Sequence, residues 1–101
     1  MEVRATCQAR ELTLYFKGEL DHHGAKNLIG QMEHEIEVAL PMKTVLDFSG
    51  VTFMDSSGIA VVMRAKMRMR EIGGSIAVRT VPAQPKKVFD AAGLDRLISI
   101  E

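Results

Sequence analysis

The chain has 101 residues, enough for one domain with a single core and too few for a second module. Apolar residues make up 47% and charged residues 26%, values typical of folded globular domains that favour neither a disordered chain nor a coiled coil. The 13 basic side chains are balanced by 13 acidic ones and tryptophan is absent, so we expect neither nucleic acid nor a membrane as a partner.

The single cysteine, Cys7, cannot form an intramolecular disulfide, which fits a reducing compartment. The first ten residues, MEVRATCQAR, carry charges and lack the apolar segment of a signal peptide. No apolar run reaches the ~18 residues that a membrane span needs. We therefore expect a cytoplasmic protein.

The first half of the chain changes its periodicity once. Apolar and polar residues alternate over residues 3–7 and 12–16, which predicts two strands joined by a tight turn at residues 9–11. Over residues 25–40 the apolar spacing becomes that of one helix face. Pro41 is expected to end this helix.

The second half alternates strands and helices. Residues 44–54, TVLDFSGVTFM, are rich in β-branched and aromatic residues and predict a buried strand that ends near residues 49–50. A helix is predicted from Ser57 to Ile72, ended by the glycines at 73–74. The remaining predicted elements are a strand over residues 75–81, a helix over 85–93 and a strand over 96–100.

This order of elements predicts an α/β fold in a single domain over residues 1–101. The sheet should be mixed and mostly parallel, with an N-terminal hairpin and helices packed against it. Loops at the carboxyl ends of parallel strands gather at one edge, where ligands usually bind. We therefore expect the segments GELDHHG, residues 18–24, and FMDSSG, residues 53–58, to lie together.

The segment Asp55-Ser56-Ser57 offers three helix-capping residues in a row, although one cap needs only one side chain. Capping alone is one interpretation. A nucleophilic serine is a second, with His22 or His23 as its base. The G-x-S-x-G pattern and a glycine-rich oxyanion segment are both missing, which disfavours a small serine hydrolase. Either Asp21 or Asp55 would have to orient the histidine.

The third interpretation makes one serine hydroxyl the acceptor of a phosphoryl group. Phosphate would add a charge of about −1.5 to −2 to the first turn of a helix, where the dipole and free N–H groups tolerate an anion. The fold would survive this charge. Binding of a partner surface to the same turn would be lost, because placing a partner against the phosphate charge costs several kcal/mol.

Three segments in this order resemble the STAS domain of anti-sigma factor antagonists: GELDHHGA, VLDFSGVTFMDSSGIAVVMRAKMRMREIGG and PKKVFDAAGL. The resemblance spans nearly the whole chain, and the pairing of GELDHH with FMDSSG is its specific part. It implies a STAS-like fold. Family members usually continue into a further helix after the final strand, whereas this sequence ends at Glu101, so we expect one sheet face to be less covered.

The resemblance also implies a function in transcription regulation, as in sporulation. The chain would bind an anti-sigma factor that is itself a serine kinase holding ATP or ADP, and would thereby release a sigma factor. That kinase would phosphorylate the second serine of the motif, Ser57, and a serine phosphatase would remove the phosphate. A stressosome-like scaffold subunit is the alternative within this family. The other implied site residues are Asp21, His22, Asp55, Ser56 and Gly58.

The helix over residues 57–72 carries two apolar lines when plotted at 100° per residue. The first is expected to face the sheet and consists of Val61, Val62, Ala65, Met69 and Ile72. The second line, Ile59, Met63 and Met67, suits either a neighbouring helix or a partner. We predict that Ile59 and Met63 belong to the anti-sigma factor interface.

Two further groupings are expected to be unremarkable in function. The three histidines, His22, His23 and His34, do not share one face, so we expect no metal site and no cofactor. The basic run from Arg64 to Arg70 is interpreted as a solvated helix flank and not as a nucleic-acid surface.

Overall fold

The computed structural model describes residues 1–101 as a five-stranded sheet with three helices. The strands are in the order β1-β2-β3-β4-β5, and only the β1–β2 pair is antiparallel. The predicted mixed α/β fold with an N-terminal hairpin is thereby confirmed. The elements are β1 (Glu2–Gln8), β2 (Glu11–Leu20), α1 (His22–Ala39), β3 (Lys43–Met54), α2 (Ser57–Glu71), β4 (Ser75–Arg79), α3 (Ala83–Ala92), the 3-10 turn η1 (Leu94–Arg96) and β5 (Ser99–Ile100).

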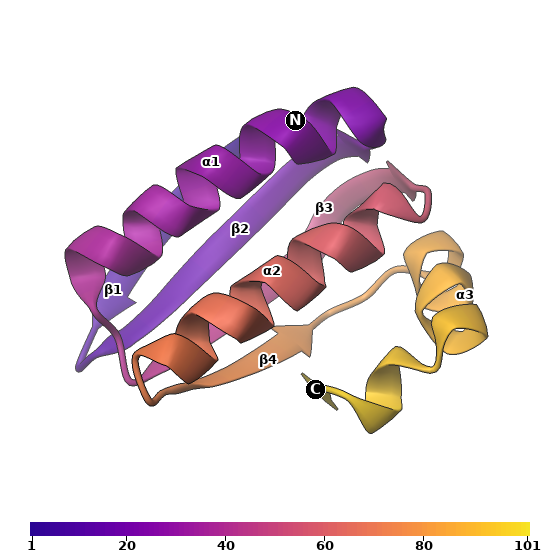
Figure 1. The fold of residues 1–101 in the computed structure, drawn as a ribbon. Coiled ribbons are helices and arrows are strands. Elements are labelled where there is room, and N and C mark those ends of the chain that lie inside the picture. Colours follow the sequence, from indigo (N-terminus) through magenta and orange to yellow (C-terminus); the bar gives the residue numbers. More distant parts are fainter.

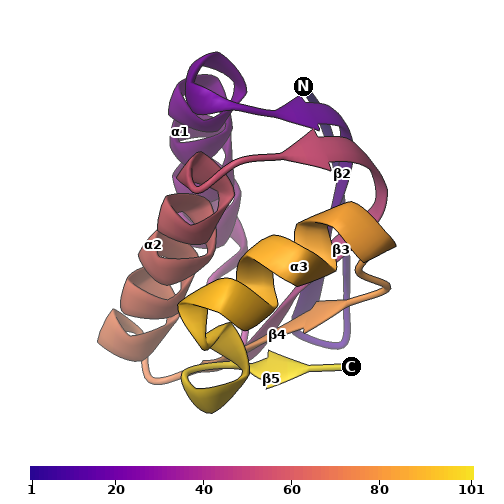
Figure 2. The same ribbon diagram turned by 90° about the vertical axis from the view of Figure 1, so that its right-hand side faces the viewer.

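The helices are distributed unevenly over the sheet. Helices α1 and α2 lie side by side across one face, and α3 lies at the end of the sheet next to β3 and α2 (Figure 1). The view turned by 90° shows both long helices on one side of the strands, with no helix over the opposite face of β1 and β2 (Figure 2). None of the helices combines the length and hydropathy that a membrane-spanning helix requires.

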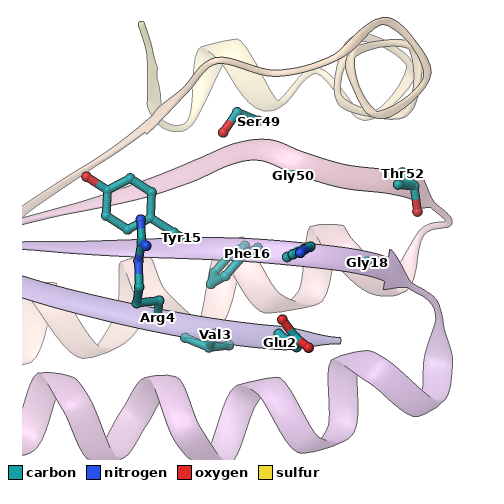
Figure 3. Close-up of a pocket in the computed structure, with 10 residues that line it drawn as sticks. Glu2, Val3, Arg4, Tyr15, Phe16, Gly18, Ser49, Gly50 and Thr52 are labelled. Atoms are coloured by element: carbon teal, nitrogen blue, oxygen red, sulfur yellow. The ribbon is translucent and has the colours of Figure 1, made fainter.

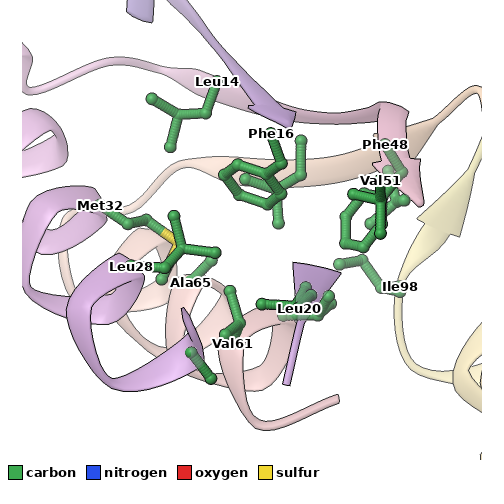
Figure 4. Packing of buried hydrophobic residues seen from close by; sticks show 14 of the residues in the cluster. Leu14, Phe16, Leu20, Leu28, Met32, Phe48, Val51, Val61, Ala65 and Ile98 are labelled. Atoms are coloured by element: carbon green, nitrogen blue, oxygen red, sulfur yellow. The ribbon is translucent and has the colours of Figure 1, made fainter. Parts of the chain in front are cut away.

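The hydrophobic core lies between the sheet and the helices, where side chains from both converge (Figure 4). Phe48 on β3 stands between Phe16 on β2 and Phe89 on α3, with ring centroids 5.3 and 5.2 Å away in edge-to-face geometry. All three rings are almost fully buried. Such burial stabilises the fold by roughly 1.5–3 kcal/mol per side chain, so these rings join α3 firmly to the sheet.

Strand β3 does not end near Ser49 and Gly50, as the sequence suggested, but continues to Met54. The strand passes these residues through an irregularity in its pairing with β2, where the register shifts between Tyr15 and Lys17. A Cβ on Gly50 would lie 2.7 Å from the carbonyl oxygen of Phe16. Gly50 therefore permits a close approach of two strands and is not a strand terminator.

Helix α2 begins at Ser57 as predicted, and the other helix boundaries differ from the predicted ones by one to three residues. Helix α2 ends at Glu71, and Ile72 is 41% exposed, so the prediction that Ile72 faces the sheet is wrong. The backbone turns away at Ile72 and then enters the left-handed region at Gly73, with φ +77°. The other predicted sheet-facing residues of α2 are buried: Val61, Val62, Ala65 and Met69.

Candidate functional site

Two helices begin side by side at the carboxyl edge of the parallel strands. The β2–β3 register pairs Leu20 with Met54, the last residues of the two strands. The backbone N–H of Asp55 donates to the carbonyl oxygen of Leu20 at 3.3 Å. The loops that follow β2 and β3 therefore meet, as the order of elements predicted.

Asp21 is the N-cap of α1. Its backbone is extended, and its Oδ1 accepts a hydrogen bond from the N–H of Gly24 at 2.8 Å. This hydrogen bond lowers the pKa of the Asp21 carboxyl below its ordinary value, and the charge of nearby His23 acts in the same direction. A Cβ on Gly24 would lie 2.7 Å from the carbonyl oxygen of Glu19, so the tight first turn requires glycine.

Ser56 occupies the N-cap position of α2, but the side-chain bond at this helix start comes from Asp55, the residue before it. The Oδ1 of Asp55 accepts the N–H of Ser57 at 2.8 Å, and its carbonyl oxygen accepts the N–H of Gly58 at 3.1 Å. Ser56 has helical backbone angles and its side chain makes no capping bond. Of the three candidate capping side chains, only that of Asp55 bonds to the helix start, so neither serine hydroxyl takes part in capping.

The two serines differ in exposure. Ser56 is exposed, whereas Ser57, the first residue of α2, is half-buried. Neither hydroxyl has a hydrogen-bond partner within the protein. In every residue that is buried or half-buried, each side-chain oxygen that is shielded from solvent has such a partner. The Oγ of Ser57 is therefore in contact with solvent, beside the first turn of α2.

Gly58 brings the first turn of α2 directly onto the strand ends. A Cβ at this position would collide with the Met54 side chain and would lie 3.2 Å from Cδ2 of Leu20. Gly58, Met54 and Leu20 are all buried. The position of Ser57 is thus fixed by packing on one side and by the Asp55 cap on the other.

The histidines of the first loop lie on the surface. His22 and His23 are exposed, with their rings edge to face and centroids 5.9 Å apart. No side-chain hydrogen bond joins either imidazole to Ser57 or to Asp55. Across the chain, no group of three or more His, Cys, Asp or Glu side chains is arranged to hold a metal ion.

The second apolar line of α2 is only partly displayed. Ile59 and Met63 are half-buried and pack against the core, whereas Met67 is 57% exposed. This apolar line therefore packs at the edge of the core near Ser57, and its last residue, Met67, is largely in solvent. Ile59 and Met63 thus combine packing against the core with a solvent-exposed edge.

The basic run of α2 is largely used within the protein. Arg64 Nη1 and Arg68 Nε lie 3.3 and 3.1 Å from Oε2 of Glu33 on α1. Lys66 Nζ donates to the carbonyl oxygen of Leu97 at 2.6 Å. These cations join α2 to its neighbours, so the run is more than a solvated flank.

A contact that sequence reasoning missed joins α3 to the end of β3. The Oε1 of Gln84 accepts the N–H of Met54 at 2.8 Å, and its Nε2 donates to the carbonyl oxygen of Met54 at 2.7 Å. Gln84 belongs to no motif and stands 30 residues from Met54, so no local signal indicated this contact. The contact lies one residue before Asp55 and thus borders the site.

The helix-free face of the sheet carries a second polar feature. Arg4, Tyr15, Asp47 and Arg79 are consecutive register partners across β1 to β4. The guanidinium of Arg4 lies 4.9 Å from the centre of the Tyr15 ring, at the side of a hollow of about 500 Å³ (Figure 3). Arg79 Nη2 donates to the Tyr15 hydroxyl at 3.2 Å. This row covers the open face with paired polar groups.

Asp47 is the buried member of this row. Arg79 Nε donates to its Oδ2 at 2.9 Å, and the Ser49 hydroxyl donates to its Oδ1 at 2.6 Å. Burial alone would raise the pKa of Asp47, but the hydrogen bonds from Ser49 and Arg79 outweigh it and hold the pKa below its ordinary value. The charged form is therefore the one that the fold stabilises.

The chain matches known proteins over nearly its whole length. The family model described as "Mlab, STAS domain" matches residues 3–99. The anti-sigma F factor antagonist of Paenibacillus polymyxa is 32% identical over 89 residues, which cover 88% of this chain and 76% of that protein.

Solved structures show the same fold. The anti-sigma factor antagonist SpoIIAA in its unphosphorylated form superposes on 99% of this chain and 88% of its own with a TM-score of 0.83, at 22% identity. The Bacillus cell fate determinant SpoIIAA in its phosphorylated form covers 99% and 91% with a TM-score of 0.73, also at 22% identity. The family match and the sequence relative agree with this fold. The chain therefore belongs to the STAS-domain family of anti-sigma factor antagonists.

Proposed function

We propose that the chain binds a serine-kinase anti-sigma factor, so that a sigma factor is released, and that phosphorylation of Ser57 switches this binding off. The observation that carries the proposal is the unused, solvent-accessible hydroxyl of Ser57 at the start of α2. A hydroxyl with no structural task can accept a phosphoryl group without the loss of a stabilising hydrogen bond.

The charges around this hydroxyl explain why a phosphate would act as a switch. Asp55 bonds to the N–H of Ser57 itself, and Asp21 caps α1 at the adjoining strand end. A phosphate would add a charge of about −1.5 to −2 beside these two carboxylates. The edge would become strongly negative while the helix start tolerates the anion, so a partner shaped for the unmodified edge would be repelled.

The proposed partner surface extends from this edge along α2. It comprises Asp21, His22, Asp55 and Ser56 around the hydroxyl, with the buried Gly58 shaping the turn beneath them, together with Ile59 and Met63 on the helix. The exposed parts of Ile59 and Met63 supply apolar area next to the switch. Because apolar contacts give affinity and the charged rim gives selectivity, binding and control can lie on one continuous surface.

The comparisons support the proposal at the level of relatives. A relative is an anti-sigma F factor antagonist, and SpoIIAA is known in phosphorylated and unphosphorylated forms. In keeping with this likeness, we propose that the chain is a non-enzymatic cytoplasmic regulator of sporulation, phosphorylated by its kinase partner and dephosphorylated by a serine phosphatase. A serine hydrolase is disfavoured, because neither His22 nor His23 is hydrogen-bonded to Ser57. No observation favours a stressosome-like scaffold subunit.

The test is site mapping by mass spectrometry after incubation with the cognate kinase and ATP. We expect one phosphoryl group on the wild-type chain and on Ser56→Ala, and none on Ser57→Ala. The alanine variant at 57 should still bind the kinase. Label that persists on Ser57→Ala and disappears on Ser56→Ala would move the switch to the more exposed serine.

A further inference from the structure

The outer edge of β3 loses its neighbouring strand before β3 ends. Strand β4 pairs with β3 only along Lys43 to Asp47. In parallel strands, alternate residues direct both backbone polar groups toward the same neighbour. Asp55 directs its N–H to Leu20 on the β2 side, so Met54 directs its N–H and carbonyl to the side that β4 has left.

The side chain of Gln84 takes the place of the missing strand at this point. Its amide oxygen accepts from the N–H of Met54 at 2.8 Å, while its amide nitrogen donates to the Met54 carbonyl at 2.7 Å. Only one orientation of the Gln84 amide allows both bonds. If the amide were flipped, its NH₂ group would face the Met54 N–H and its oxygen would face the Met54 carbonyl oxygen. Gln84 thus mimics the peptide group of a neighbouring strand, although its side chain is otherwise exposed.

Met54 connects this contact to the proposed switch. Its side chain is fully buried, and the first turn of α2 packs on it at Gly58. The next residue, Asp55, caps Ser57. A displacement of the Met54 backbone would therefore move both the cap and the surface on which the helix start rests.

We propose that Gln84 is a positioning residue for the switch loop, residues 55–58, and that it holds Ser57 in the orientation that the kinase recognises. This inference rests on the proposed function and adds α3 to the elements that control it. Gln84 acts through Met54 and touches neither the hydroxyl nor the phosphoryl group.

The experiment compares Gln84→Met, which keeps the size of the side chain and removes both bonds, with Gln31→Met on the exposed surface of α1. Urea unfolding first establishes that both variants are folded. Amide hydrogen exchange is then measured at Met54 and Ser57, followed by kcat/KM of the kinase on each chain. For Gln84→Met we expect about fivefold to a hundredfold faster exchange and a loss of similar size in kcat/KM, as for the removal of two hydrogen bonds of ordinary strength.

A second variant separates positioning from general packing. The carboxylate of Gln84→Glu accepts the Met54 N–H but repels the Met54 carbonyl, whereas its protonated form can again donate. Protection of Met54 should therefore fall at pH 7 and return as the pH approaches about 4, near the ordinary glutamic acid pKa. Gln31→Glu should show no such recovery at the same pH values.

Unchanged exchange at Met54 in Gln84→Met would overturn the positioning role. Faster exchange with unchanged kcat/KM would overturn the link between Gln84 and the switch. If the kinase neither binds nor labels the wild-type chain, the proposed function is overturned instead. The exchange measurement does not involve the kinase, so it still decides whether Gln84 positions Met54.

Discussion

Asp55 fixes the start of the second helix through one hydrogen bond to Ser57, whose backbone N–H lies 2.8 Å from the Asp55 Oδ1. The bond uses the amide of Ser57 and leaves its hydroxyl free. Asp55, two residues before Ser57, thus supplies the capping side chain, and Ser57 itself supplies none. This division of tasks leads to the first prediction.

Replacement of Asp55 by alanine should lower the free energy of unfolding by about 1 kcal/mol, the usual effect of losing a side-chain bond to a backbone N–H at a helix start. Asp55→Asn keeps an acceptor oxygen and should lose only a few tenths of that amount. Ser56→Ala and Ser57→Ala should be close to neutral, since neither hydroxyl caps the helix. Urea denaturation of the four variants checks this order, and a Ser57→Ala loss as large as that of Asp55→Ala would contradict it.

Two glycines inside helices should respond to alanine with opposite signs. A Cβ on Gly58 would collide with Met54 and approach Leu20 to 3.2 Å, so we expect a loss of about 1–3 kcal/mol in unfolding free energy. A Cβ on Gly30 in α1 would meet nothing within 4 Å, so alanine there should add about 0.5–1 kcal/mol. Thermal and urea unfolding measure both, and a neutral Gly58→Ala would show that the packing is looser than described.

The pH dependence of stability should carry the signature of Asp47. Its folded pKa is depressed, so the charged form contributes stability that is complete above the unfolded pKa of about 3.9 and disappears as the pH falls through the folded value. At pH 7, Asp47→Asn should therefore lower the unfolding free energy by about 1–2 kcal/mol. Below about pH 3 the difference should shrink. Urea titrations at both pH values decide this, and a difference independent of pH would refute the ionic role.

The partner surface can be tested with two methionines of one helix. Met63 lies closer to Ser57 than Met67 does, by about 6 Å along the helix axis. We expect Met63→Asp to weaken anti-sigma factor binding at least tenfold and Met67→Asp to have a much smaller effect. Calorimetric titration of each variant, with circular dichroism to confirm folding, makes the comparison. Equal affinities for Met63→Asp and the wild type would remove Met63 from the interface.

The sequence was informative wherever a local pattern decides the structure. Alternation over β1 and β2, helical spacing over α1 and α2, and glycine at position 93 each fix an element by themselves. The left-handed backbone at Gly93, with φ +66°, ends α3 at the last position of the predicted helix. The order of these elements then places the two loops at one edge, because parallel strands leave little choice.

The sequence misled where a residue serves a distant contact. Gly50 resembled a strand end, but its small size is required by the carbonyl of Phe16, more than 30 residues earlier in the chain. The bonds of Gln84 to Met54 and of Arg79 to Asp47 join residues 30 and 32 positions apart. Neither pair has a periodicity or a motif, so only the folded arrangement reveals them.

The measurement that tests the central claim most directly is the affinity of the anti-sigma factor for the unmodified chain and for the chain phosphorylated at Ser57. The account predicts that phosphorylation weakens binding at least a hundredfold, about 2.7 kcal/mol, because the added charge lies beside two carboxylates. Circular dichroism and urea unfolding of the phosphorylated chain should show an intact fold. Equal affinities for the two forms would contradict the account, as would a loss of binding that arises only because the phosphorylated chain has unfolded.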